Sequence, residues 1–295
     1  MPAVSSVKGG PPVSGSVTTF FDSLWNVPAS QKGTPTADNP YASQFVSYSN
    51  RLEVSGVLGS GSGITYAKPI YFAQPGDPVA DVSVSEPSWV KGDIHWDGKP
   101  IPVPAGVTPA PGSDGHLVVV SANRRTAWEM WRCTKADTSG YETVTISQWD
   151  LTGSGVPSVG VDNSSARGSG TPVIPTTIRA EEALRGIRHA LGITVPHVSS
   201  DYIYPPTTHS DGGLGPDGIK YGMLFVLRSD YPVPANASIG ERNVIQALKT
   251  YGAYVVDQGA SMELDADSTH PDLWAQSGLS ANSLDIGPDD FRLIQ

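Results

Sequence analysis

The chain has 295 residues and a mass of 31.0 kDa, and only 16% of its residues are charged, whereas it contains 32 glycines and 26 prolines. This composition favours many short strands joined by turns over long helices. A formal net charge of -10, with no run of basic residues, disfavours nucleic acid as a partner, and no segment approaches the roughly 20 apolar residues that membrane insertion requires.

The first 40 residues are rich in Ser, Gly, Pro and Thr, and one aromatic cluster from Phe20 to Trp25 interrupts them. They predict a flexible N-terminal arm over residues 1–40 whose aromatic cluster docks on the body of the protein. After the arm, short alternating segments separated by turn residues predict antiparallel strands. These segments are residues 45–54, 69–73, 79–84, 116–122, 127–134 and 141–151.

Two segments carry helical patterns instead. Residues 180–191 combine good helix formers with acids in the first turn and bases in the last. Residues 241–251 place Val244, Ile245 and Leu248 on one face. Residues 223–228 and 254–257 are predicted as core strands, and residues 265–272 as an acidic loop. We therefore expect residues 41–295 to form a single, mostly β domain, an antiparallel β-sandwich of the jelly-roll or lectin-like type with two or three short helices.

Strand alternation around the predicted hairpin turn at residues 123–126 places a carboxylate beside an indole. Glu129 and Trp131 fall on one face together with Cys133, while Met130 falls on the other. An indole can stack on a sugar ring while a carboxylate accepts hydroxyl protons or acts as an acid or nucleophile. Trp149 is a second candidate platform. The alternative is an exposed strand glutamate beside a core tryptophan.

Asp114 and His116 precede the same hairpin and bring a carboxylate and an imidazole to the edge of the predicted sheet. If Asp114 faces Glu129, a short separation of the two carboxyl groups indicates retaining hydrolysis and a longer one inversion. Asp-Gly is also an ordinary turn dipeptide, so a purely structural turn remains the alternative.

Glu182, Arg185 and His189 share one face of the first predicted helix. Glu182 could orient His189 as a general acid or base, and Arg185 could contact the substrate. The alternative is a histidine that only caps the end of the helix. Asp211, in a glycine-rich loop, is a further candidate catalytic carboxylate.

The chemistry expected here requires no cofactor. Two acidic loops, at residues 209–218 and 265–272, could hold a structural calcium ion, although neither fits an EF-hand. The histidines lack the spacing of a zinc site. Cys133 is the only cysteine, so the chain cannot form an internal disulfide.

A set of short motifs extends from about residue 40 to the C-terminus. They are Ser-Asp-Gly-His at 113–116, Trp-Glu-Met-Trp at 128–131, Gly-Thr-Pro at 170–172, Glu182 before Gly-Ile-Arg-His-Ala-Leu at 186–191, Asp-Gly at 211–212, Ala-Leu-Lys-Thr-Tyr-Gly at 247–252 and Asp-Gln-Gly at 257–259. The set resembles an uncharacterised family of bacterial, largely actinobacterial, secreted or surface proteins. The chain departs from the family at Trp128, where a tyrosine is expected, and at residues 167–170. The resemblance implies a lectin-like or jelly-roll body and an extracellular location.

Taken together, the residues favour a secreted enzyme that degrades a polysaccharide by general acid/base catalysis, as a glycoside hydrolase or a lyase. Its catalytic candidates are Glu129, Asp114, His189, Glu182 and Asp211, and its candidate substrate contacts are His116, Trp131, Trp149 and Arg185. The first alternative is a carbohydrate-binding adhesin or virion module without catalysis. The second is a structural surface protein whose polar motifs are turns and caps.

Overall fold

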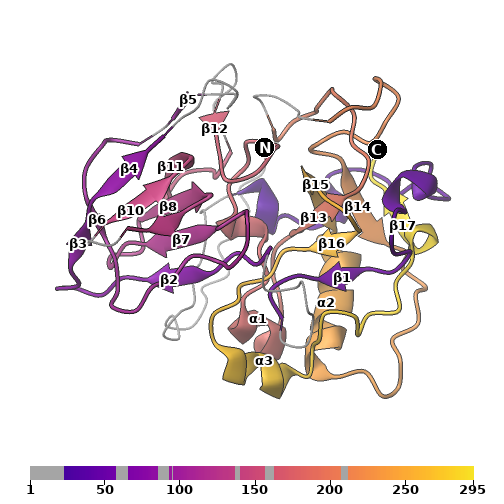
Figure 1. Cartoon of the computed structure of the whole chain (residues 1–295). Coiled ribbons are helices and arrows are strands. Elements are labelled where there is room, and N and C mark those ends of the chain that lie inside the picture. Colours follow the sequence, from indigo (N-terminus) through magenta and orange to yellow (C-terminus); the bar gives the residue numbers. More distant parts are fainter. Residues whose placement is uncertain are drawn as a thin grey trace.

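The computed structural model describes residues 23–57, 66–85, 93–94, 96–136, 140–156, 163–206 and 212–295. Within them, strands predominate over helices and form several mixed sheets, none of which closes into a barrel. Figure 1 shows the two largest sheets side by side. One has four strands and comes from the first half of the chain, whereas the other has six and comes mainly from the second half.

The six-stranded sheet joins one strand from near the N-terminus to strands from the C-terminal half. Its strands are β1 Glu53–Val54, β13 Leu191–Val195, β14 Leu224–Leu227, β15 Ala253–Gln258, β16 Glu263–Leu264 and β17 Phe291–Leu293. Their order is β1-β16-β13-β15-β14-β17. β1 is parallel to β16 and β13 is parallel to β15, whereas the other neighbours are antiparallel.

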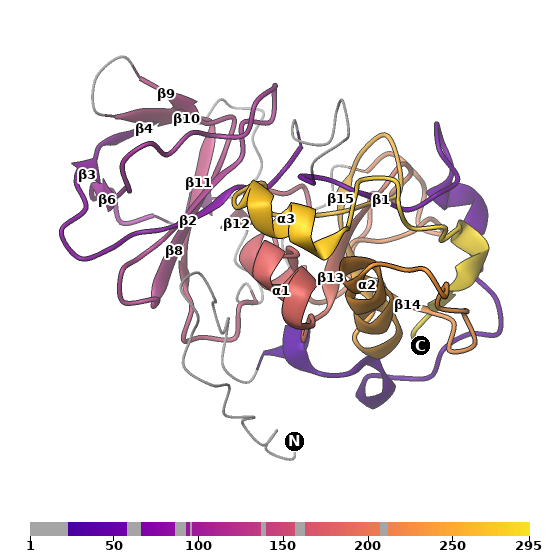
Figure 2. The same ribbon diagram turned by 90° about the horizontal axis from the view of Figure 1, so that it is seen from below.

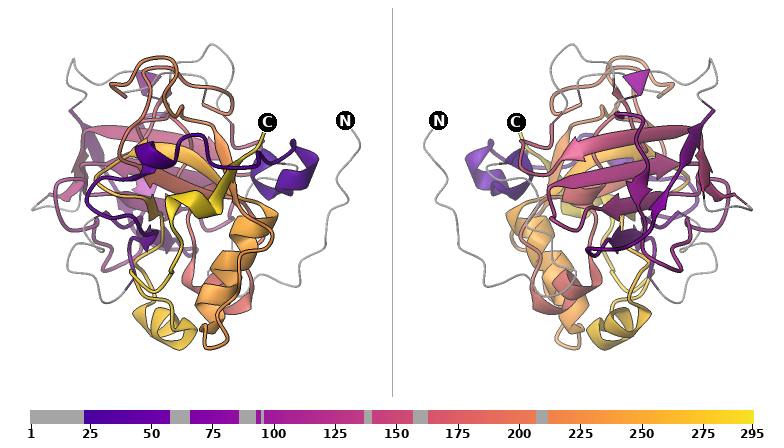
Figure 3. Two further views of the ribbon diagram at one scale, coloured as in Figure 1. Left: turned by 90° about the vertical axis from the view of Figure 1, so that its right-hand side faces the viewer. Right: turned by 90° about the vertical axis from the view of Figure 1, so that its left-hand side faces the viewer.

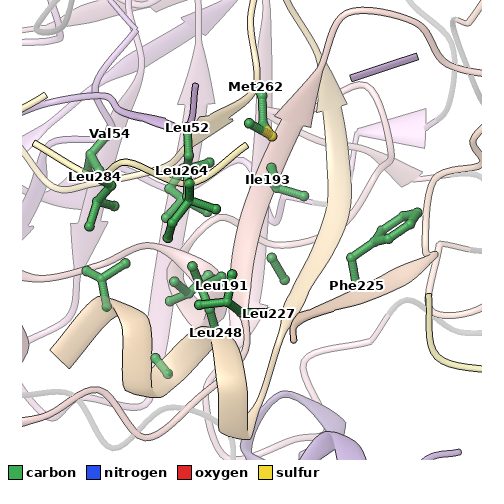
Figure 4. Packing of buried hydrophobic residues seen from close by; sticks show 14 of the residues in the cluster. Leu52, Val54, Leu191, Ile193, Phe225, Leu227, Leu248, Met262, Leu264 and Leu284 are labelled. Atoms are coloured by element: carbon green, nitrogen blue, oxygen red, sulfur yellow. The ribbon is translucent and has the colours of Figure 1, made fainter. Parts of the chain in front are cut away.

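Three α-helices of the described chain cover one face of this sheet, as Figure 2 shows from below. They are α1 Ala180–Arg185, α2 Ile239–Thr250 and α3 Pro271–Ser277. The predicted apolar face of α2 packs on the sheet, and Figure 4 shows Leu248 beside Leu191 and Leu227. A capping box starts α2, because Ser238 Oγ accepts from Glu241 N at 3.2 Å and Glu241 Oε2 accepts from Ser238 N at 2.6 Å.

The four-stranded sheet carries the predicted hairpin. Its strands are β2 Ile70–Phe72, β7 Leu117–Val120, β8 Thr126–Trp131 and β11 Thr145–Asp150. Their order is β11-β8-β7-β2, with β8 antiparallel to both neighbours and β2 parallel to β7. Figure 3 shows the molecule from its two ends, with this sheet nearer the viewer on the right.

Short strands and 3-10 turns complete the described chain. The strands are β3 Val79–Ala80 with β6 Ile101–Pro102, β5 Asp93–Ile94 with β12 Asn163–Ser164, and β4 Val82–Val84 with β10 Tyr141–Thr143 and β9 Thr134–Lys135. The turns are η1 Leu24–Asn26, η2 Ala29–Gln31, η3 Ala42–Phe45, η4 Ile174–Thr176 and η5 Pro288–Asp290.

The two large sheets face each other across a shared apolar cluster. The four-stranded sheet contributes Ile70, Val118, Val120, Ala127 and Trp149, and the six-stranded sheet contributes Leu224, Val226, Tyr254 and Val256. The opposite face of the four-stranded sheet packs Met130 and its neighbours against the short strands. The face of the four-stranded sheet that bears Glu129 is therefore directed at the second large sheet.

Trp25 is fully buried between these sheets. Its indole Nε1 donates to Gly155 O at 3.1 Å, its carbonyl accepts from Ala190 N at 2.7 Å, and its ring meets Tyr254 edge-on at 5.1 Å. Pro35 also bridges to Ile294 next to β17. The part of the predicted arm from residue 23 to 40 is thus packed against the body, while residues 1–22, including Phe20 and Phe21, lie outside the described residues.

The mostly β character predicted from the sequence is confirmed, but the antiparallel sandwich is not, because parallel pairs occur in both large sheets. The strand predicted over residues 45–54 reduces to η3 and the two residues of β1. In this segment Leu52 N donates to Ile286 O, Glu53 N to Met262 O and Val54 N to Ala281 O, so the backbone bonds run to three separate segments. Because these bonds run to three separate segments, only Glu53 and Val54 of this segment form a regular strand.

One predicted helix and one predicted loop also need correction. α1 ends at Arg185 instead of residue 191, because Gly186 adopts φ 108°, which residues with a side chain rarely adopt, and the chain then enters β13. The acidic loop predicted at residues 265–272 runs into α3, which Pro271 starts at the first helical position with Asp272 in the first turn. None of the helices in the described ranges has the length and apolar character of a membrane span.

Candidate functional site

A row of polar side chains lies where the four-stranded sheet faces the six-stranded one. Ile70 pairs with Val118, and Val118 with Glu129. Two residues before these positions, Lys68 and His116 therefore lie on the same face, side by side. Lys68 Nζ is 2.6 Å from His116 Nε2, and both side chains are buried. The sheet thus places an ammonium group in direct contact with an imidazole.

The contact fixes the tautomer of His116. A lysine ammonium can only donate, so Nε2 accepts and the ring proton lies on Nδ1, which has no hydrogen-bond partner among the described residues. Burial, followed by the charges of Lys68 and Arg167, lowers the pKa of His116 well below 6.5. The imidazole is therefore neutral near pH 7. Its Nδ1–H is a buried donor that no described residue accepts from.

Asp265 connects this pair to the opposite sheet. Its Oδ1 lies 3.8 Å from Lys68 Nζ, and its Oδ2 forms a very short ion pair with Arg167 Nη2. Backbone bonds support the same junction, because Lys68 N donates to Ala266 O at 3.1 Å and Ile70 N to Asp267 Oδ1 at 3.0 Å. One carboxylate thus faces two buried cations that come from distant segments.

Arg167 is held by the segment between β12 and α1. Its Nη1 donates to Pro172 O and to Thr176 Oγ1, each at 2.7 Å. A Cβ at Gly192 would lie 3.1 Å from Arg167 Nη2 and 2.9 Å from Thr176 Oγ1, so β13 closes directly over the guanidinium. Arg167 is buried, with its position fixed on all these sides.

Glu129 anchors the same segment from the four-stranded sheet. Its carboxylate accepts from Val173 N at 2.8 Å and 2.9 Å, from Ile174 N at 3.0 Å and from Trp149 Nε1 at 3.0 Å. Burial raises the pKa of Glu129 to about 7, although these donors and Arg167 favour the ionised form. The side chain is fully buried, so it is placed to position the segment and not to meet a polymer.

Asp114 is the candidate carboxylate that reaches solvent. Its side chain is 30% exposed, and its Oδ2 lies 3.9 Å from His116 Nε2. Gly115, at φ 43°, separates the two residues, and a Cβ there would lie 2.7 Å from Cys133 O. Because only glycine fits this close approach, the predicted Asp-Gly-His turn holds Asp114 beside the buried imidazole.

Glu263 is a second partly accessible carboxyl group on this junction. It pairs with Glu53 of the parallel strand β1 and lies two residues from Asp265 on the same face of β16. Burial and the neighbouring Asp265 raise the pKa of Glu263 to about 7, opposed by Ser55 and Lys68. Part of its population is therefore protonated at neutral pH.

Glu182 and His189 do meet, but not on one helix. His189 lies after α1, and its Nε2 is 3.1 Å from Glu182 Oε2 while its Nδ1 is 2.8 Å from Ala190 O. Glu182 also forms a very short ion pair with Arg179. Arg185 is exposed at the end of α1. The prediction that Glu182, Arg185 and His189 share one helical face is therefore wrong. The two ring nitrogens of His189 contact Glu182 in α1 and Ala190 just before β13.

The tryptophan assignments separate along the sheet. Trp149 is buried against Glu129, whereas Trp131 is half-buried, with Arg132 4.5 Å from its ring centre. Cys133, predicted on the face of Glu129, instead packs near Met130 at 4.0 Å, because Arg132 has φ 51° and interrupts the alternation. Asp211 lies outside the described residues.

Lys68, Arg167, Asp265 and Glu263 are absent from the sequence-based site. A signal for two of them exists, because Glu263, Asp265 and Asp267 alternate with Leu264 and Ala266 as in a strand with one polar face. No such signal identifies Lys68 or Arg167, which belong to separate segments and meet only through Asp265.

No group of three or more His, Cys, Asp or Glu side chains in the described residues is arranged to hold a metal ion. Asp265 faces two cations, and Asp267 accepts from Ile70 N, Thr269 N and Thr269 Oγ1. These carboxylates are therefore occupied by protein donors, which does not suit the calcium site predicted for this loop.

Comparison with known proteins adds no evidence about the function of this site. The chain matches no protein-family model, no curated protein and no solved structure. The resemblance to an actinobacterial family accordingly stays a prediction.

Replacing Arg167 tests the junction. Arg167→Met leaves Asp265 with the more distant Lys68 alone in a buried site, and should lower the free energy of unfolding by about 3–5 kcal/mol in urea titrations. The matched control is Arg51→Met, which breaks a 3.1 Å pair with Asp285 whose side chains are 62% and 74% exposed. The control should cost less than about 1 kcal/mol. Equal small losses in both variants would mean that the buried pair does not hold the sheets together.

The raised pKa of Glu263 predicts a pH-dependent stability difference. The folded protein keeps a proton on Glu263 between the ordinary pKa of 4.5 and about 7, whereas the unfolded chain releases it. The wild type therefore loses stability as the pH rises through this window. Glu263→Gln should gain about 3 kcal/mol relative to wild type by about pH 8, and nothing from ionisation below about pH 4. Urea titrations at several pH values measure it, with the exposed Glu142→Gln as control. A gap between wild type and Glu263→Gln that does not vary with pH would contradict the assignment.

Proposed function

We propose that this chain is an extracellular enzyme that cleaves a neutral polysaccharide by acid/base catalysis at the junction of its two large sheets. The observation that carries the proposal is the position of a solvent-reaching carboxylate, Asp114, whose Oδ2 lies 3.9 Å from Nε2 of the buried His116, which Lys68 contacts at 2.6 Å. A carboxylate of this kind, fixed beside preorganised charges, suits a group that contacts the scissile sugar.

The roles divide among few residues. Asp114 acts as base or nucleophile, Gly115 holds it beside the neutral His116, and Glu263 is the candidate proton donor because part of it is protonated near pH 7. Glu129 positions the segment that presents Arg167. Of the two tryptophans predicted to stack on a sugar, only the half-buried Trp131 keeps that role in this proposal.

The charge of the chain supports hydrolysis over elimination. A lyase acts on uronates, whose carboxylates a protein of net charge -10 repels at long range. The two buried cations that could neutralise a uronate, Lys68 and Arg167, already face Asp265. A neutral glycan carries no carboxylate, so it is not repelled at long range and needs no buried cation to neutralise it.

Carbohydrate binding without catalysis is the second candidate. The deep burial of Glu129, Asp265 and Arg167 favours it, because a polar cluster enclosed in this way can serve only to join the sheets. The two candidates differ in whether Asp114 matters for turnover.

Replacing Asp114 distinguishes them. Wild type should release reducing ends from at least one member of a panel of neutral polysaccharides, and Asp114→Asn should lose at least about 100-fold in kcat, as expected when an acid/base group is removed. Because Asp114 is partly exposed, its variant should unfold like wild type. The exposed Asp38→Asn is the matched control and should keep full activity.

Absorbance near 232 nm, read on parallel samples of uronate-containing polysaccharides, reports unsaturated uronate, and a rise there would assign the chain to a lyase reaction instead of hydrolysis. Full turnover by Asp114→Asn would remove the proposed mechanism. Binding of a glycan by wild type without any product would support the non-catalytic module.

A further inference from the structure

The largest concentration of exposed apolar side chains in the described residues lies between β13 and β14. Tyr202 is 38% exposed, Ile203 43%, Tyr204 61% and Leu214 36%. The other large exposed apolar residues are dispersed along the chain. Three of these residues are consecutive in the chain, and Leu214 lies in the segment that bridges to Ser199, so their backbones lie close together. Exposed apolar groups gathered in this way mark a binding surface more often than isolated ones do. We call these four residues the tyrosine platform.

Backbone bonds hold the platform on the protein. Ile203 N donates to Tyr221 O at 2.9 Å, and Leu214 N donates to Val198 O at 3.0 Å. Ser200 N donates in turn to Leu214 O at 2.9 Å. Two separate segments are thereby fixed side by side, so their rings lose little freedom when a ligand binds.

The surroundings of the platform indicate the charge of its ligand. Asp201 Oδ2 lies 3.4 Å from Lys220 Nζ with its side chain 51% exposed, and Asp217 is exposed nearby in sequence. The one lysine is thus paired and a second carboxylate remains, in a chain of net charge -10. An anionic polymer is disfavoured here, whereas hydroxyl groups can bond to the carboxylates.

The platform adjoins the junction of the sheets. Ile203 N donates to Tyr221 O, and the next residue, Gly222, donates its N–H to Val255 O on β15 at 2.9 Å, so the platform segment lies next to β15, which also carries Tyr254. Tyr254 pairs with Gly192, which lies against Arg167. A ligand on the platform would therefore extend towards the residues of the candidate site.

The size of the platform disfavours a stable protein partner. A lasting protein interface buries about 800 Å² and 20 or more residues on each side, whereas four side chains make up the platform. A narrow ligand with apolar faces and hydroxyl edges matches it, since aromatic rings stack on the faces of pyranose sugars.

We propose that the tyrosine platform binds a neutral, pyranose-based polysaccharide by stacking and delivers it to the junction. The inference rests on the substrate class of the proposed function, but it concerns binding and does not need cleavage.

Affinity gel electrophoresis of the full chain tests it, with amylose, glucomannan, arabinoxylan and hydroxyethyl cellulose as the probes. At least one polymer should retard wild type, and Tyr202→Ala with Tyr204→Ala should raise the dissociation constant at least tenfold. Tyr204→Phe should keep most of the affinity because it keeps the ring. Tyr48→Ala, at a position that is 89% exposed outside the platform, is the matched control and should bind like wild type.

Thermal unfolding of each variant shows that lost retardation is not lost folding, and Tyr204→Phe keeps the test valid if the double variant is unstable. Equal retardation of wild type and the double variant, or no retardation of wild type by any of the polymers, overturns the platform. Self-association that the double variant abolishes would assign the surface to a second copy of the chain and also overturn it. Platform-dependent binding with no product from wild type leaves the platform standing and removes the proposed catalysis.

Discussion

The structure depends on one buried carboxylate, Asp265, that faces two cations from different parts of the chain. Lys68 comes from the start of the four-stranded sheet and Arg167 from the segment before α1. Buried charges of this kind are tolerated only when they are paired and hydrogen-bonded, so the three residues require one another. Their mutual requirement fixes how the two sheets meet, in addition to the apolar cluster between them.

The same interaction determines the chemistry available at the junction. Lys68, with Asp265 beside it, donates to His116, and this contact sets the tautomer of the imidazole. Asp114 is thereby held against a neutral, buried ring, while Glu129 secures the segment that presents Arg167. Positioning residues thus outnumber the groups that can touch a substrate, which are Asp114, Glu263 and the half-buried Trp131.

Local patterns were sufficient for the mostly β character of the chain and for the positions of several side chains on their strands. Alternation correctly placed Glu129 with Trp131 and opposite Met130, and helical periodicity identified α2. These patterns failed at two positions where a single residue changes the direction of the backbone. Helical periodicity did not predict that Gly186 ends α1, and alternation did not predict that Arg132 moves Cys133 to the other face. Lys68, Arg167 and Asp265 could not be predicted together, because their relation exists only after distant segments pack, and no local spacing encodes it.

The measurement that tests this account most directly is the ¹⁵N spectrum of His116 in the full chain as a function of pH, assigned with a His116→Gln variant. If Lys68 donates to a buried ring, His116 should remain neutral with its proton on Nδ1 as the pH falls through 6.5, where an unperturbed histidine gains a proton. Titration of His116 near pH 6.5, or a proton on Nε2, would contradict the arrangement of Asp265, Lys68 and His116 on which the proposed site rests.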